Sequence, residues 1–365
     1  MHSSSDPSSS SRSGSATMQD IANHLDLSIS TVSRALRHLK GTNANTRARV
    51  LNAARELGYV VEEGKHSTPV KSQGLRHIGV FVETASNSPP PEYLNGMSGA
   101  AVQLGASLML HYEEPDHCEH ILNPLTQPSA LRAGLLSGAV LVFWWPEKVV
   151  AELSRLLPVV SIMHKYPGLD TDMVGIDNEE GIRLLLRHLV DLRHRRIGFF
   201  GRSGHFHWAA ARFAGYVLGL TQLNIPYNEA LVCDAEYEDI KHYNAKWSQP
   251  CLEAERLVRE ENVTAFVCVS ESAGWELHNH LTSKGIRIPE DVSITGFHRS
   301  GSPGNPMADL TSTSASYEAL GAAALRRVFY RIQNPQESPR TISFQCRLYN
   351  GSTTGPAPAR NQSLV

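Results

Sequence analysis

From residue 77 to residue 297, short apolar runs alternate with segments of helical periodicity. The first apolar runs are Ile78–Val82, Ser107–His111 and Ala139–Phe143, and the helical segment Tyr93–Gly105 lies between the first two. The alternation restarts at Ile197–Gly201 and continues to residue 297. Strands that alternate with helices form βαβ units, in which parallel strands make one sheet with helices on both faces. The two series predict an α/β core of two doubly wound parallel-sheet subdomains separated by a cleft.

The regions flanking this core differ from it in pattern. Residues 17–60 have helical patterning, which predicts an all-α headpiece, whereas the neighbouring segments are rich in Ser, Gly, Pro and charged residues. We expect a disordered arm at 1–16, the headpiece at 17–60, a linker at 61–75, the core at 76–353 and a disordered tail at 354–365. Within the core, we expect one subdomain at about 76–191 plus 311–335 and a second at about 192–308 plus 338–353.

Charge is distributed unevenly between headpiece and core. The formal net charge of the 365 residues is −2. Residues 17–60 nevertheless contain six Lys and Arg against three Asp and Glu. A basic module on an acidic body favours one oriented contact with a polyanion such as DNA.

The five cysteines are widely spaced and form no CxxC pair, which argues against a disulfide framework and fits a reducing compartment. The Ser-rich start lacks the apolar region of a secretory signal. No apolar run reaches the roughly 18 residues needed to span a bilayer. We therefore expect a cytoplasmic protein, associated with the nucleoid when bound to DNA and without membrane contact.

The headpiece sequence carries the local signals of a helix-turn-helix. Thr17 is suited to cap a first helix, and Asp26 falls at the tight turn that often needs a left-handed backbone. Ser28 is suited to cap a second helix that begins at Ile29, and Asn43 a third. Three short helices of this kind place the second one in the major groove of DNA.

The headpiece resembles the lac repressor family of bacterial regulators through two strings, TVSRAL at 31–36 and NTRARVLNAARELGY at 45–59. The likeness extends from Thr17 to about Thr353, and it implies a sequence-specific DNA-binding transcription regulator that acts as a repressor. It places Ile29, Ser30 and Arg34 at base-reading positions, and an arginine there can donate two hydrogen bonds to a guanine. Side chains suited to phosphate contacts are Thr17, Ser28, Thr31, Ser33, Asn43 and Thr46.

The linker departs from the family pattern. Family members usually continue with a short helix that wedges a Leu into the minor groove. Here the sequence is VVEEGKHSTPVKSQG, and Ser67 and Thr68 fall at the wedge position. Whether this linker forms a hinge helix is left open by the sequence.

The core resembles the periplasmic-binding-protein fold that this family uses as a sensor, through VGIDNEEG, RFAGY and RIPEDVSITGF. The resemblance implies effector contacts by Asp177 and Arg212, although Asp177 also suits a helix cap and Arg212 a structural ion pair. Ser270 and Glu271 stand where the family usually has Asn-Asp, and His298 where it usually has Asp. These changes predict a carbohydrate-related effector other than a plain neutral sugar. Trp144 and Trp145 follow the third strand, where they would either stack on the ligand or pack internally.

No phosphate-binding loop, nucleophile motif or metal-ligand spacing appears in the sequence, so we expect no enzymatic activity, cofactor or metal. His117, Cys118, Glu119 and His120 contain ligand types, but adjacent residues of one loop cannot all face one ion. A solute receptor with no regulatory DNA role is the alternative, and it would require a signal peptide. The expected partners are a pseudo-palindromic operator DNA, a small-molecule effector of the saccharide class, and a second copy of the chain in a homodimer.

Overall fold

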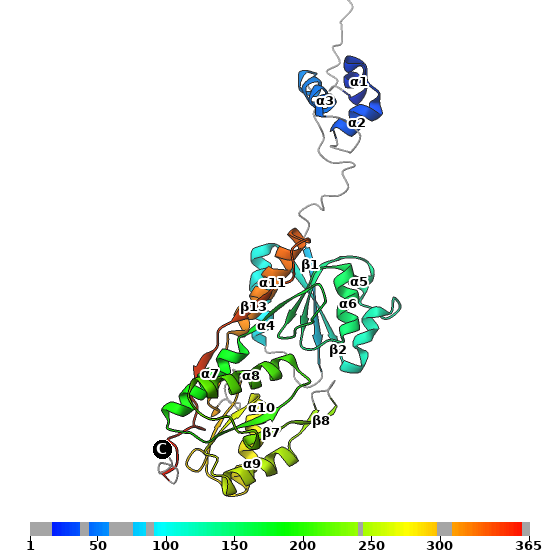
Figure 1. Ribbon diagram of the computed structural model, residues 1–365. Helices are drawn as coiled ribbons and strands as arrows, with labels where there is room; N and C mark the ends of the chain where they lie inside the picture. Colours follow the sequence, from blue (N-terminus) through cyan, green and yellow to red (C-terminus); the bar gives the residue numbers. More distant parts are fainter. Residues whose placement is uncertain are drawn as a thin grey trace, which may run out of the picture. The chain divides into compact units, whose positions relative to one another are not determined.

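The computed structural model describes residues 17–36, 44–57, 76–84, 91–239, 244–297 and 309–359. The chain divides into two compact units, residues 1–74 and 75–365. Figure 1 shows the helical headpiece in the first and the α/β core in the second. The expected arm at 1–16 and the linker at 61–75 lie outside the described residues. Within the described ranges, no helix is both long and apolar enough to cross a membrane.

The headpiece consists of three short helices, α1 (Met18–Leu25), α2 (Ile29–Leu36) and α3 (Ala44–Glu56). Each helix contacts the other two. Their apolar faces meet in a small core, whose fully or almost fully buried members are Ile21, Ala22, Val32, Ala35, Val50, Ala53 and Ala54. Most of these are small or β-branched, so the three helix axes lie close together around a compact centre.

Local side chains define the helix ends in the headpiece. The Thr17 hydroxyl accepts from the backbone N–H of Asp20, and the Asp20 carboxylate accepts from the Thr17 N–H at 2.7 Å, which completes a capping box. Asp26 ends α1 in the left-handed region with φ of 54°. The Ser28 hydroxyl then accepts from the Thr31 N–H at 3.2 Å and caps α2. These three expected turn and cap positions are confirmed, and Asn43 lies outside the described residues.

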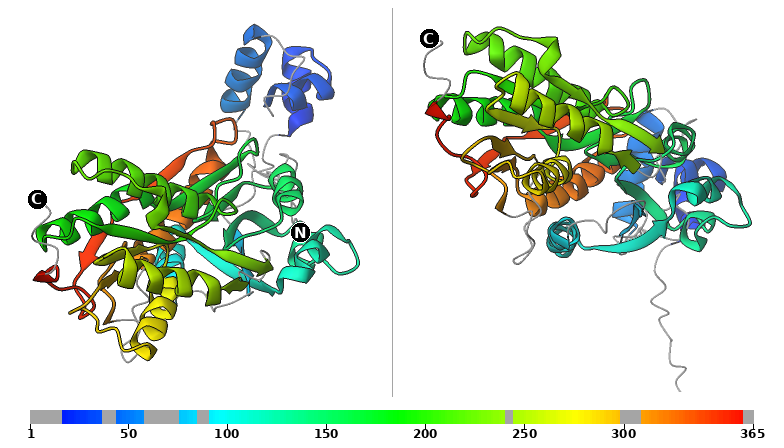
Figure 2. Two further views of the ribbon diagram at one scale, coloured as in Figure 1. Left: turned by 60° about the horizontal axis from the view of Figure 1, so that its bottom comes forward. Right: turned by 90° about the horizontal axis from the view of Figure 1, so that it is seen from below.

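The first core sheet contains six parallel strands in the order β13-β5-β4-β3-β1-β2. The strands are β1 (Arg76–Glu83), β2 (Ala106–Glu113), β3 (Leu136–Val142), β4 (Val159–Ile162), β5 (Thr171–Ile176) and β13 (Thr341–Phe344). Helices α4 (Pro91–Leu104) and α11 (Tyr317–Gln333) pack side by side on one face (Figure 2). The opposite face carries η1 (Pro115–Leu122), α5 (Ser129–Arg132) and α6 (Glu147–Leu156) around a separate apolar cluster.

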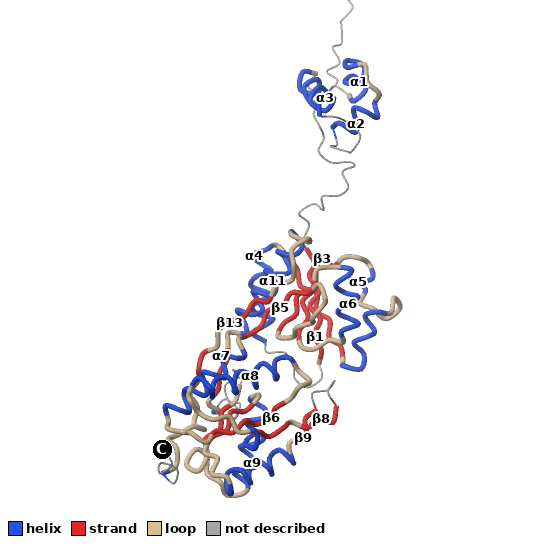
Figure 3. The backbone as a smooth tube through the Cα atoms, viewed as in Figure 1, coloured by secondary structure: helices blue, strands red, loops and turns tan. Residues whose placement is uncertain are grey.

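The second sheet contains four parallel strands in the order β11-β10-β6-β7. They are β6 (Ile197–Arg202), β7 (Val232–Asp234), β10 (Ala265–Cys268) and β11 (Ser293–Thr295), and Figure 3 shows β6 well apart from β1, β3 and β5. Its helices are α7 (Asn178–Asp191), α8 (His207–Gln222), α9 (Ser248–Glu260) and α10 (Glu271–Ser283). A short turn, η2 (Glu229–Leu231), precedes β7, and a hairpin of β8 (Glu236–Asp239) and β9 (Asn244–Lys246) follows it.

The points where the chain crosses between subdomains differ from the sequence expectation. Helix α7, expected in the first subdomain, packs against α8 and β10 of the second. Strand β13, expected in the second, pairs with β5 in the first sheet. The remaining strands β12 (Ser312–Ser314) and β14 (Arg347–Tyr349) pair antiparallel with each other and contact α7. Helical periodicity shows that α7 is a helix but not which sheet it covers, and this explains the error.

The expectation of a disordered tail at 354–365 is wrong for residues 354–359. The N–H of Ala357 donates to the carbonyl of Leu192, and Gly355 bonds to Ser293. His194 is fully buried beneath this segment, and its Nε2 donates to the Gly355 carbonyl at 3.0 Å. Hydrogen bonds from the backbone of this segment to Leu192, Ser293 and His194 therefore hold it, although it lacks large apolar side chains.

A buried ionic network ties α11 to β5. Asp172 is fully buried, and its carboxylate accepts from Arg327 at 2.9 Å and from the backbone N–H of Arg340 at 2.5 Å. Arg331, also buried, lies with its Nε 3.4 Å from the same carboxylate and bonds Asp170 at 2.6 Å. Buried charges are tolerated when they are paired in this way.

Candidate DNA-binding and effector sites

The first turn of α2 presents an exposed polar face with one apolar side chain. Ser28, Ile29 and Ser30 are exposed, and Ile29 has 46% of its surface accessible. The hydroxyl groups of Ser28 and Thr31 lie 2.8 Å apart, and those of Ser28 and Ser30 lie 2.9 Å apart. The helix start thus offers clustered hydroxyls, which suit phosphate oxygens, beside an apolar group that suits a thymine methyl.

The other predicted DNA contacts are placed only in part. Arg34 lies in α2, one turn after Ser30, but its side chain and all of Asn43 are outside the described residues. Ser33 in α2 and Thr46 in α3 are half-buried, and Thr17 is exposed at the start of α1. Among the described positions, the exposed predicted contacts are therefore Thr17 on α1 and the group Ser28, Ile29 and Ser30 at the start of α2.

The carboxyl ends of two central strands in the first sheet have unusual backbone geometry. Phe143 follows β3 with φ of 68°, and Met163 follows β4 with φ of 70°. Bulky residues with positive φ are strained, and such residues gather at ligand sites. This edge of a parallel sheet is also where ligands of α/β folds bind. His164, which follows Met163, is buried there, and burial lowers its pKa to about 3.

Arg212 lies on α8 with only 3% of its surface exposed. Its Nε donates to Asn178 Oδ1 at 2.9 Å, and Nη1 donates to the Val269 carbonyl at 2.7 Å. Its guanidinium carbon lies 3.8 Å from the centre of the Phe297 ring. Burial lowers the pKa of Arg212 to about 9. Within the described ranges Arg212 has no ion-pair partner, so the structural ion pair considered from the sequence is absent among these residues.

An aromatic series continues from Arg212. Its guanidinium lies 4.6 Å from the Trp208 ring, and Trp208 stacks on Phe206 with centres 5.5 Å apart. Tyr237, from β8, meets Phe206 edge-on at 5.3 Å. These flat groups, none of them in the expected site list, give the region around Arg212 the surfaces that bind rings. Trp208 stands four residues before Arg212, so helical spacing alone would have placed it beside the arginine.

Two tyrosines approach the same region from the first subdomain. Tyr93 on α4 and Tyr317 on α11 are both buried, with ring centres 5.2 Å apart. Burial raises the pKa of Tyr93 well above its ordinary range, and Arg212 acts in the opposite direction on it. The Tyr93 hydroxyl has no hydrogen-bond partner among the described residues. A buried hydroxyl near a cation is suited to meet a polar group of a ligand.

The remaining predicted effector residues have mixed outcomes. Asp177 caps α7, because its carboxylate accepts from the Glu180 N–H at 3.0 Å, and Ser270 caps α10 in the same way through Ala273 at 3.1 Å. Glu271 is buried at the start of α10, and its N–H donates to the Phe297 carbonyl. His298 lies outside the described residues.

For Trp145, the structure contradicts ligand stacking and shows the alternative, internal packing. The side chain is fully buried, its indole N–H donates to the Val142 carbonyl at 3.2 Å, and it meets Phe81 edge-on. It belongs to the apolar cluster beneath α6, so its ring has no open face. Trp144 is half-buried, and its contact with a ligand stays a prediction.

The residues with metal-ligand side chains at 117–120 lie in the 3-10 helix η1, where His117, Glu119 and His120 are exposed. His117 and His120 stack with ring centres 4.7 Å apart, while Cys118 is fully buried in the apolar cluster. In the described part of the chain, no group of three or more His, Cys, Asp or Glu is arranged to hold a metal ion. The five cysteines are free and buried.

Two family models match the chain. Residues 17–61 match the model described as bacterial regulatory proteins, lacI family, and residues 186–354 match a periplasmic binding protein-like domain. The chain belongs to the lacI family of bacterial regulatory proteins. As a member, it is a DNA-binding transcription regulator with an effector-binding core, and the alternative of a receptor with no role on DNA is not favoured.

Curated relatives agree over almost the whole length. The transcriptional repressor PurR of Mannheimia succiniciproducens is 24% identical over 338 residues, which cover 91% of this chain and 97% of the relative. The transcriptional regulator AglR of Rhizobium meliloti is 25% identical, covering 94% and 96%. This lacI-family chain therefore aligns with these regulators over nearly their whole length.

Solved structures share the fold. A complex of the transcriptional regulator CelR with cellobiose has a TM-score of 0.60 at 22% identity, covering 93% of this chain and 99% of that one. The lac repressor dimer bound to operator and the anti-inducer ONPF has a TM-score of 0.57 at 20% identity, covering 94% and 100%. At these identities the likeness shows a shared fold. It does not show that this chain binds the same ligands or forms the same oligomer as those proteins.

Proposed function

We propose that this lacI-family regulator represses transcription as a homodimer on a pseudo-palindromic operator, and that a small molecule bound at Arg212 controls its DNA affinity. The observation that most supports DNA binding is the exposed start of α2, which combines the apolar side chain of Ile29 with the hydroxyl groups of Ser28 and Ser30. PurR, a relative, is named as a repressor, which supports the same direction of control here. This function places the protein in the cytoplasm.

Base reading by Arg34 gives the first prediction. Replacing Arg34 with Ala removes two hydrogen bonds to a guanine edge and is expected to cost about 1–3 kcal/mol on the preferred site. The variant should also discriminate less among the four bases at one base pair of each half-site. Binding selection with both proteins measures this, and Ser33→Ala, at a phosphate-contact position, should weaken all sequences equally. An unchanged base preference in Arg34→Ala would exclude it from the reading face.

A homodimer is supported by the exposed side of the first subdomain. Strand β2 is an edge of its sheet, and Leu110 and Tyr112 on it are exposed, as is Val102 on α4. Exposed edges and apolar groups of this kind favour association. Light scattering at micromolar concentration should give a dimer, and Tyr112→Asp should shift it towards monomer. A tetramer or a monomer of the unaltered protein would contradict the proposal.

The effector is proposed to be a modified or larger saccharide rather than a plain neutral monosaccharide. Arg212 offers a buried cation suited to a hydroxyl pair or a carboxylate, and the half-buried side chains of Trp208 and Trp144 are suited to contact a sugar ring. An acidic sugar would suit the cation further, whereas the buried Glu271 disfavours an anion. CelR was solved with cellobiose, which supports a saccharide larger than one ring.

A thermal-shift screen of saccharides followed by calorimetry tests the effector proposal. Because charged hydrogen bonds contribute about 1.5–3 kcal/mol, Arg212→Lys should weaken the best hit roughly 10-fold to 100-fold. His298→Ala should also change its affinity. Tight binding of a neutral monosaccharide that is undiminished in His298→Ala would contradict the predicted class.

A further inference from the structure

The helix α8 is apolar on two sides, and only one of them is covered. Its inner side buries Ala209, Tyr216 and Leu220, while its outer side carries a second apolar stripe at helical spacing. The stripe consists of Ala210, Phe213, Ala214, Val217 and Leu218. A helix that is apolar all round is normally covered on all sides.

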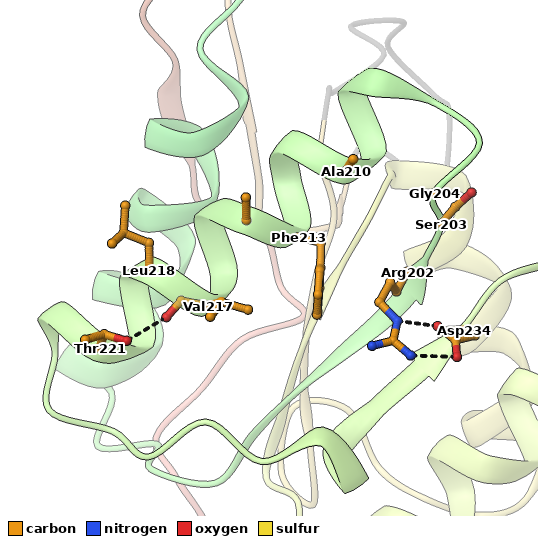
Figure 4. A pocket seen from close by; sticks show the side chains of 10 residues that line it. Arg202, Ser203, Gly204, Ala210, Phe213, Val217, Leu218, Thr221 and Asp234 are labelled. Atoms are coloured by element: carbon orange, nitrogen blue, oxygen red, sulfur yellow. Dashed lines mark hydrogen bonds and ion pairs between the residues drawn. The ribbon is translucent and has the colours of Figure 1, made fainter.

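The uncovered stripe lines a hollow of about 710 Å³ (Figure 4). Pockets for small ligands range from about 300 to 1,000 Å³ and have mostly apolar walls with a few fixed polar groups. The hollow lies next to β7, the edge strand of the second sheet, and Asp234 at the end of β7 forms part of its wall. Its size fits a single small molecule.

Arg202 and Asp234 line the hollow, and Glu229 lies beside it as a second partner of Arg202, so this charged group has a net negative charge. Arg202 binds both oxygens of Asp234, at 2.5 and 2.8 Å, and a Glu229 oxygen at 2.6 Å. Its guanidinium carbon also lies 5.2 Å from the centre of the Phe213 ring. One cation thus faces two carboxylates, both of which are more than half exposed. Hydrogen bonds from Tyr227 and Arg202 lower the pKa of Glu229, so it is ionised at neutral pH.

We propose that this hollow is a second small-molecule site, distinct from the region around Arg212, and that it takes a cationic amphiphile of the arylalkylamine class. The ring lies on Phe213, Val217 and Leu218, and the ammonium group faces Asp234 and Glu229. Arg212 is buried in the core, and Phe213 follows it about 100° further round α8, so the two sites lie on different faces of one helix. The guanidinium group of Arg202 already binds the carboxylates of Asp234 and Glu229, so it is not available to pair with an anionic ligand.

Ligand-detected NMR titration of the full-length protein tests the proposal with three probes of one shape: 2-phenylethylamine, 2-phenylethanol and 3-phenylpropionate. We expect saturable binding in the millimolar range for the amine, as is usual for so small a molecule, with weaker binding of the alcohol and weakest of the acid. Equal binding of the acid and the amine, or no saturable binding of the amine, would overturn the proposal.

A matched pair of substitutions locates the site. Leu218 and Leu252 are half-exposed leucines on helices, with 44% and 49% of their surfaces accessible, and only Leu218 lines the hollow. Leu218→Arg should weaken the amine at least ten-fold, whereas Leu252→Arg should leave its affinity within two-fold. Val217→Trp, which fills the hollow, is a second variant, and unaltered melting temperatures show that each protein is folded. Undiminished binding in both Leu218→Arg and Val217→Trp would overturn the proposal.

Discussion

The core is expected to lose about 4 kcal/mol of unfolding free energy between pH 7.5 and pH 5 through two buried histidines. Burial lowers the pKa of His164 to about 3 and that of His194 to about 4, from an ordinary value of 6.5. Between about pH 6.5 and these values, the unfolded chain binds protons that the folded core excludes, so stability falls as pH decreases. At pH 5 each histidine contributes about 2 kcal/mol, since one pKa unit corresponds to about 1.4 kcal/mol.

Urea unfolding followed by tryptophan fluorescence measures this loss, because all five tryptophans lie in the core. His194→Gln retains a donor for the Gly355 carbonyl but does not titrate. Between pH 7.5 and pH 5 this variant should therefore lose about 2 kcal/mol less unfolding free energy than the unaltered protein. The exposed His120→Gln is the control and should keep the full dependence. The same pH dependence in His194→Gln as in the unaltered protein would contradict the assignment.

Asp172→Asn is expected to destabilise the core by about 3–5 kcal/mol at neutral pH. The carboxylate is fully buried between Arg327 and Arg331, and removing its charge leaves two buried guanidinium groups without this partner. The amide also cannot accept from Arg327 as strongly as a carboxylate does.

Asp170→Asn is the matched control for this network. Asp170 also binds Arg331, at 2.6 Å, but its side chain is 60% exposed. Exposed ion pairs contribute between about 0 and 1 kcal/mol, so this variant should unfold at nearly the urea concentration of the unaltered protein. Equal destabilisation by the two substitutions would show that burial does not set the energetics of the network.

The features that sequence alone predicted are those that depend on neighbouring residues. The cap at Thr17, the left-handed Asp26 and the cap at Ser28 each involve groups within four residues, so residue type and spacing suffice to find them. The alternation of strands and helices was likewise predicted, because burial in a parallel sheet produces apolar runs.

The features that were missed depend on contacts between distant segments. Phe297 lies just after β11 and 85 residues beyond Arg212 in the chain, and no local pattern indicates that the two come into contact. Trp145 follows a strand end, as a ligand contact would, but its indole finds an acceptor in Val142 and turns inwards. The segment at 354–359 is held by backbone groups of Leu192 and by His194, neither of which its own composition reveals.

The central claim is that the headpiece recognises DNA under control of a ligand in the core, and one binding selection tests it most directly. Full-length protein is incubated with random DNA, and the recovered site is titrated with and without the best hit of the thermal-shift screen. The account predicts a two-fold symmetric site, with two half-sites whose centres are one helical turn or a multiple of it apart, and an affinity that changes when the hit is added. Recovery of no preferred sequence, or an affinity that every core-binding molecule leaves unchanged, would contradict it.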